Sequence, residues 1–146
     1  MRFTLHIDPN AEEEIIARVR KRSALTDDIE EMVRAADKPT VLTAYGEDDI
    51  LVLQIREIEC IFTEDGRTWA QYSDGKRYRV RARLYEIEDD LPPDFIRINK
   101  SAIANRRKIR RFLTQLTGAV DAEFNSGHRD YVSRRCFSEL RRRLDL

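Results

Sequence analysis

The stretch that decides the fold is Phe95–Leu144, which reads FIRINKSAIANRRKIRRFLTQLTGAVDAEFNSGHRDYVSRRCFSELRRRL. Two basic, polar segments within it, NKSAIANRRK and GHRDYVSRRC, flank a run with strand-like alternation. From Phe95 to Leu146 the chain has 13 basic and 5 acidic residues, a local charge of +8, whereas Met1–Ile50 carries −5 and Leu51–Asp94 carries −3. This asymmetry, hidden by a net charge of zero, favours a basic end that meets a polyanion and an acidic body that keeps the chain soluble.

Length and composition indicate one domain, or one domain with a small appendage, in a chain of 146 residues. No apolar run approaches the roughly 18 residues of a membrane helix. The N-terminal MRFTLHIDPN lacks a charged-then-apolar leader, so secretion is not expected. Cys60 and Cys136 have no C-x-x-C spacing and fit buried free thiols in a reducing compartment. We therefore expect a cytoplasmic protein.

The first 39 residues predict a small strand-strand-helix unit. Apolar and polar residues alternate over residues 3–7, which indicates a half-buried strand. Asp8-Pro9 could begin a helix through Glu12–Glu14, but alternation over residues 15–21 favours a second strand instead. Thr26 followed by two aspartates is typical of a helix start. The apolar face of that helix would comprise Ile29, Met32, Val33 and Ala36.

From Thr40 the hydrophobic period changes to two, which predicts strands. Asp74-Gly75 is the strongest hairpin signal in the chain. Ser133 is expected to cap the final helix, and a short helix is expected before Pro92-Pro93. There is no parallel β-α-β rhythm, so the predicted class is α+β and β-rich. The predicted strands are 41–45, 50–55, 58–63, 69–72, 77–83, 95–98, 116–124 and 129–132.

The residues give little support for catalysis. The only histidines are His6, on a predicted strand, and His128, at a turn where surface polarity and a DNA or ligand contact are equally open. No Cys-His group has metal-ligand spacing, no glycine-rich loop opens a helix, and no G-x-S-x-G occurs. We expect no enzyme, no catalytic residues, no metal site, no cofactor and no small-molecule substrate.

Nucleic-acid binding is better supported. Arg134 and Arg135 occupy the first turn of the last helix, where two cations oppose the helix dipole. Such a placement is reasonable if an anion or a base edge arrives there. Arginine can bind guanine bidentately and asparagine can bind adenine, so Asn105, directly before Arg106-Arg107-Lys108, is a second candidate. Solvated arginines and a turn asparagine are the alternative interpretation.

The segment FIRINKSAIANRRKI, a strand pair turned at NSG and then YVSRRCFSELRRRL together resemble the LytTR family of bacterial DNA-binding domains. That family shows an F-x-R-x-x-x-S-x-x-V-N segment and a V-S-R-R segment that opens the last helix. The resemblance covers roughly Val41–Leu144. It implies an elongated, mostly antiparallel β fold whose loops enter successive major grooves of DNA.

The resemblance also assigns contact residues. Its base-contacting positions carry over to Asn105 and Arg135, with Arg67 as the donor of a third contact in the loop 64–67. Ala104 and Cys136 depart from the family's usual larger aliphatic and aromatic residues, which we interpret as packing changes. The remaining residues expected to hold phosphates or bases are Lys100, Ser101, Arg106, Arg107, Arg129 and Arg134.

About 40 residues precede the resemblance, too few for a receiver domain, so no phosphorylation-triggered response regulator is expected. The chain resembles compact LytTR regulators, which often pair with a small inhibitory membrane protein. Residues 1–39 would be a dimerisation or regulatory unit, with core packing as an equal alternative, and residues 40–146 the DNA-binding domain. The overall prediction is a homodimeric, sequence-specific transcription regulator that binds double-stranded DNA in the major groove. The alternative is a protein-interaction module that sequesters another regulator through its basic end.

Overall fold

The computed structural model describes residues Met1–Leu144. By its internal contacts the chain divides into two compact units, Met1–Ala36 and the residues from Asp37 onward. No helix in the described residues is both long and apolar enough to cross a bilayer.

The first unit is built on helix α1 (Ala24–Ala35). Ser23 and Thr26 cap it reciprocally: the Thr26 amide donates to the Ser23 hydroxyl and the Ser23 amide donates to the Thr26 hydroxyl. The N-cap is therefore Ser23, three residues before Thr26, where the sequence predicts the helix start. Arg22, which precedes the helix, forms ion pairs of 2.6 Å with Asp27 and Glu30.

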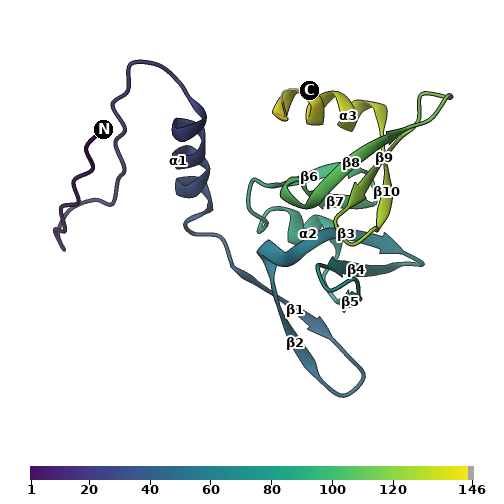
Figure 1. The fold of residues 1–146 in the computed structure, drawn as a ribbon. Helices are drawn as coiled ribbons and strands as arrows, with labels where there is room; N and C mark the ends of the chain where they lie inside the picture. Colours follow the sequence, from purple (N-terminus) through teal and green to yellow (C-terminus); the bar gives the residue numbers. More distant parts are fainter. Residues whose placement is uncertain (145–146) are drawn as a thin grey trace. The chain divides into compact units, whose positions relative to one another are not determined.

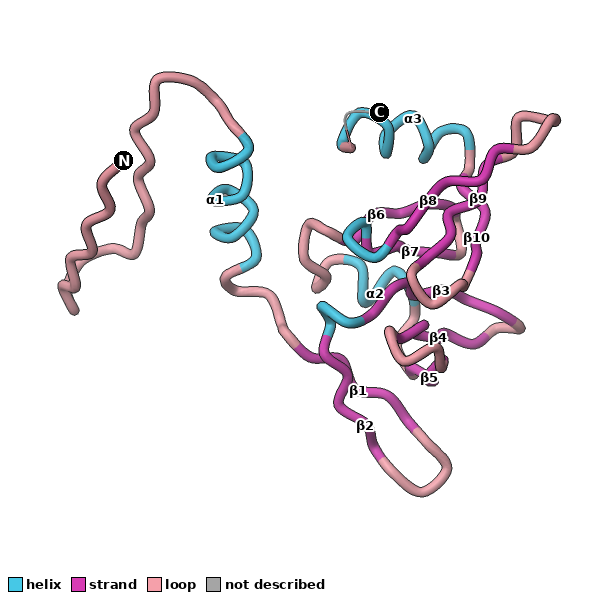
Figure 2. The backbone as a smooth tube through the Cα atoms, viewed as in Figure 1, coloured by secondary structure: helices cyan, strands magenta, loops and turns pink. Residues whose placement is uncertain are grey.

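The two strands predicted over residues 3–7 and 15–21 are wrong: residues 1–22 contain turns and irregular backbone but no strand (Figure 2). Alternation shows only that a segment can present an apolar face. A strand also needs a paired neighbour and a core, and a two-stranded ribbon alone is marginal in water. None of residues 1–36 is buried, so this unit supplies no such core.

The second unit contains a seven-stranded antiparallel sheet in the order β2-β1-β5-β4-β3-β7-β6 (Figure 1). Short turns join most sequence neighbours, which accounts for the antiparallel pairing. Its strands are β1 (Val41–Tyr45), β2 (Ile50–Gln54), β3 (Ile58–Glu64), β4 (Arg67–Tyr72), β5 (Arg77–Val80), β6 (Phe95–Asn99) and β7 (Ala102–Asn105).

A second sheet has three antiparallel strands in the order β10-β9-β8. Its strands are β8 (Ile109–Thr114), β9 (Val120–Phe124) and β10 (Arg129–Val132). Helix α3 (Arg134–Arg143) follows, capped by Ser133 as predicted, while α2 (Leu84–Glu88) lies between β5 and β6. Two 3-10 turns, η1 (Ile55–Glu57) and η2 (Arg106–Lys108), precede β3 and β8. The α+β, β-rich class is confirmed.

Strands β3, β7 and β6 lie between two hydrophobic clusters. One cluster joins Ile61 and Ile103 to α2, and the other joins Phe62 and Ile98 to the three-stranded sheet and α3. Because both faces are covered, every residue of β7 is buried and its sequence shows no alternation. This is why sequence periodicity assigned no strand to residues 102–105.

Three turns differ from expectation. The two-residue hairpin loop is Asp65-Gly66, where both residues have positive φ (52° and 73°) as a type I′ turn requires. At Asp74-Gly75 the loop is longer, with the Tyr72 amide bonded to the Lys76 carbonyl. The strand predicted over residues 116–124 starts only at Val120, because Leu116 and Gly118 form the β8–β9 turn.

Candidate nucleic-acid interface

The turn between β6 and β7 is Asn99-Lys100-Ser101. The Asn99 side chain is buried; its oxygen accepts from the Ser101 amide (2.7 Å) and its nitrogen donates to the Tyr131 carbonyl (2.8 Å). Arg97 donates to the Lys100 carbonyl (3.0 Å) and binds both oxygens of Glu88 (2.8 and 3.2 Å). These bonds fix the backbone of the turn while the Lys100 side chain is exposed.

Two other segments meet this turn. The Thr63 amide donates to the Ser101 carbonyl (2.9 Å), which places the end of β3, and hence the Glu64–Arg67 hairpin tip, beside it. The Ser133 amide donates to the Ile98 carbonyl (2.8 Å), which places the start of α3 on its other side. The hairpin tip and the start of α3 both lie on the right of Figure 1. We call residues 64–67, 99–101 and 133–135 the three-loop surface.

The cations of the three-loop surface are unpaired in the part of the chain that the structure describes. Within residues 1–144 the side chains of Arg67, Lys100, Arg134 and Arg135 are exposed and make no hydrogen bond or ion pair. A surface pocket has Lys100 and Arg135 in its lining, so these two residues border the same hollow. Four cations with unused donors therefore lie on three adjacent segments, although Glu64 and Asp65 accompany Arg67 in the first of them. Such donors are available to an external polyanion.

Asn105, Arg106 and Arg107 lie at the other end of β7. Asn105 is buried; its nitrogen donates to the Ile58 carbonyl (3.0 Å) and its oxygen accepts from the Arg107 amide (3.1 Å), which caps η2. Arg106 and Arg107 both bind Asp94, at 3.0 and 2.8 Å. The base-contact role that the resemblance gives Asn105 stays a prediction, but in this structure its amide holds backbone together.

Arg129 belongs to a second ion-pair cluster. Glu123 is buried and accepts from Arg111 (3.0 Å), Arg129 (2.9 Å) and Arg110. Hydrogen bonds from Arg111 and Arg110, together with their positive charge, lower the pKa of Glu123 from 4.5 to about 2. These guanidiniums are half exposed, so one buried carboxylate holds three outward-facing cations.

The Glu123 cluster predicts an acid-dependent stability. Because the folded-state pKa of Glu123 is lowered, its contribution is complete above pH 4.5 and is lost as the pH falls from about 4.5 towards 2. Chemical unfolding measures the free energy of unfolding at pH 6 and at pH 3. Between these two pH values it should fall by a large amount for the wild type and by a smaller amount for Glu123→Gln. Glu139→Gln, a half-exposed glutamate on α3, is the control and should keep the wild-type loss. Equal losses in all three proteins would contradict the assignment.

Asn99, Arg97 and Glu123 were missed by sequence reasoning. The Asn99 side chain bonds residues 31 and 32 positions away, which no local pattern reveals. One local signal existed, because an asparagine two residues before a turn residue commonly accepts a backbone hydrogen bond, as it does here from Ser101.

The arrangement of strands, turns and helix α3 is also found in known proteins. The family model of the LytTr DNA-binding domain matches residues 48–145. The chain belongs to the LytTR family. A solved LytTr DNA-binding domain from Bacillus cereus superposes with a TM-score of 0.67 at 23% identity and covers 74% of this chain and 99% of its own, which supports the shared fold.

Curated relatives of this LytTR protein extend over its full length. Two uncharacterized HTH-type transcriptional regulators from Staphylococcus aureus, one from strain COL and one from a bovine strain, are 26% and 28% identical to it. Each alignment covers 100% of this chain and 99% of the relative. The alignments therefore include the N-terminal unit, which the family model does not reach.

Proposed function

We propose that the protein is a transcription regulator that binds double-stranded DNA in a sequence-specific manner through the three-loop surface, and that it acts in the cytoplasm. Family membership makes it a LytTR DNA-binding protein, and the relatives' names place them among transcriptional regulators. The alternative, a module that sequesters another regulator, has no support from these comparisons.

The observation that carries the proposal is the division of the cations. Those of the three-loop surface are free of protein partners within residues 1–144, whereas Arg106, Arg107 and Arg129 are bound to carboxylates. A phosphate or a base edge must displace Asp94 or Glu123 to reach the second group, whereas it breaks no ion pair within residues 1–144 at the first. The free group therefore provides the primary contacts.

Within the three-loop surface we assign two kinds of contact. Arg135, at the start of α3, and Arg67, at the tip of the β3–β4 hairpin, would read bases in the major groove, where a guanidinium fits guanine O6 and N7. Lys100, Ser101 and Arg134 would hold phosphates. Arg106, Arg107 and Arg129 would make peripheral phosphate contacts through their remaining donors, and Asn105 would support η2.

The N-terminal unit is proposed to be the dimerisation or regulatory part of a homodimer that binds paired sites. Support comes from apolar side chains that remain outside any core in that unit: Phe3, Ile7, Ile15, Met32 and Val33 are all exposed. A second copy is one occupant of this surface, and an inhibitory membrane protein is another. Sedimentation of the full chain and of Met32→Asp would distinguish self-association from a free monomer.

Lys100→Ala is expected to weaken binding to specific and random duplexes alike. Losing one phosphate contact should also reduce the slope of log K against log salt by about 1. Fluorescence anisotropy over a salt series measures both. Lys76→Ala is the matched control, since Lys76 lies in the β4–β5 loop at the opposite end of β4 from Arg67. If Lys100→Ala lost affinity only for the specific duplex, the phosphate role of Lys100 would be contradicted.

A further inference from the structure

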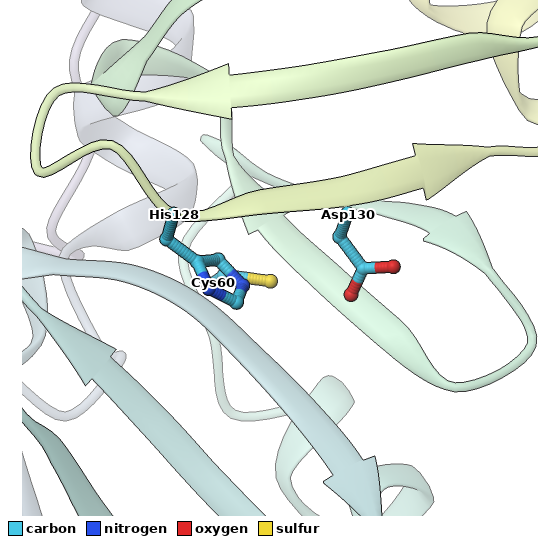
Figure 3. Close-up of side chains that lie close together, drawn as sticks. All are labelled: Cys60, His128 and Asp130. Atoms are coloured by element: carbon cyan, nitrogen blue, oxygen red, sulfur yellow. The ribbon is translucent and has the colours of Figure 1, made fainter.

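Cys60, His128 and Asp130 meet in the hydrophobic cluster that joins the two sheets (Figure 3). Cys60 lies on β3, His128 follows the β9–β10 turn, and Asp130 lies on β10. The Cys60 sulfur, a His128 ring nitrogen and an Asp130 carboxylate oxygen all lie within 4.8 Å of one another. Sequence spacing could not show this, because 68 residues separate the thiol from the imidazole.

Packing explains only part of the His128 environment. Its ring stacks on Phe62 (centroids 5.1 Å apart) and is tilted against Phe124 (5.7 Å). Stacking uses the faces of the ring, yet Nε2 at its edge is buried and has no hydrogen-bond partner within the described residues. A buried polar atom without a hydrogen-bond partner lowers the stability of the fold, so a ligand bound to Nε2 would remove that cost.

We propose that Cys60, His128 and Asp130 form a zinc-binding site. A thiolate, an imidazole and a carboxylate are the three ligand types that Zn²⁺ takes in proteins, with a water as the fourth. Bond lengths of about 2.0–2.3 Å bring tetrahedral ligand atoms to about 3–4 Å from one another. In this structure the three ligand atoms lie within 4.8 Å of one another, so metal binding would draw them closer together.

The surroundings favour a cation. Glu59 and Glu64 as well as Asp130 act on His128 with negative charge, and Arg77 is the opposing positive charge. Burial raises the pKa of the Cys60 thiol well above its usual value and lowers the pKa of His128. Asp130 also accepts from Asn99 (3.2 Å), which places the site beneath the three-loop surface.

Cobalt tests the site, because Co²⁺ occupies zinc sites and its bond to a thiolate gives a near-ultraviolet charge-transfer band. The chelator-treated full chain should take up one Co²⁺ with that band, and one equivalent of Zn²⁺ should abolish it. Cys60→Ala should lose the band, whereas Cys136→Ala should keep it. His128→Gln should raise the Kd for Co²⁺ at least tenfold. His6→Gln is its matched control and should leave that Kd unchanged.

Asp130→Asn keeps the shape of the third ligand and removes its charge. It therefore tests the site even if Cys60→Ala, at a buried position, fails to fold. Circular dichroism and thermal unfolding establish that each variant is folded. Absence of the band in the wild type, or a band that persists in Cys60→Ala, would overturn the proposal. These readouts need no DNA, so they are independent of the proposed function.

Discussion

Replacing Arg135 by alanine is expected to raise the Kd for the protein's own DNA site by about 5- to 150-fold, which corresponds to about 1–3 kcal/mol. Arg135 lies in the first turn of α3, where its charge opposes the helix dipole, and its guanidinium has no partner within residues 1–144. A side chain in that situation contributes little to folding, and its donors are available to a base edge. The loss should therefore concentrate at one base pair of the site.

The measurement is a titration of wild-type and variant protein on a panel of duplexes, each altered at one position. Arg142→Ala is the matched control: Arg142 is exposed on the same helix but pairs with Glu139 in the last turn, away from the three-loop surface. It should bind nearly as the wild type does. If Arg135→Ala loses affinity equally on specific and random DNA, Arg135 holds a phosphate and the base-reading assignment is wrong.

Replacing Asn105 by alanine is expected to destabilise the fold by about 1–3 kcal/mol while leaving DNA affinity nearly unchanged. The substitution removes the partner of the buried Ile58 carbonyl and the cap of the Arg107 amide. Chemical unfolding measures the first effect, and titration of the folded variant measures the second. This separates a supporting role from the base-contact role that the resemblance implies.

Asn125→Ala is the matched control, because Asn125 is exposed in the β9–β10 turn. Within residues 1–144 its side chain makes no hydrogen bond, and its backbone amide donates to the Lys108 carbonyl. Its stability should stay within about 0.5 kcal/mol of the wild type. A normally stable Asn105→Ala that loses discrimination at one base pair would restore the base-reading prediction and would require the loop to rearrange on DNA.

Local pattern predicted the strands with one polar face and failed where tertiary structure decides. β1, β10 and the Ser133 cap are predicted correctly, because alternation and a hydroxyl before a helix are local signals. β7 was not predicted, because the second sheet covers the face that would otherwise be polar. Residues 3–7 have the pattern of a strand without a strand beside them, which a single segment cannot reveal.

Charge and motif in the sequence indicate the basic segments of the candidate interface, but they do not show which cations are paired within the protein. Lys100 and Arg107 look equivalent in sequence, yet one is free within the described chain and the other binds Asp94, which lies 13 positions earlier. The Nε of Arg129 likewise donates to the Glu123 carboxylate. Counting basic residues therefore overestimates the charge available to DNA, and only the folded arrangement shows which cations remain.

The most direct test of the central claim is selection of bound sequences from a random duplex library by the full chain. The proposed function predicts enrichment of a pair of short repeats spaced by about one helical turn, as a dimer on paired sites requires. The same selection with Arg135→Ala should lose one position of each repeat. General, salt-sensitive retention without any enriched sequence would contradict sequence-specific binding and leave the three-loop surface as a site for polyanions at large.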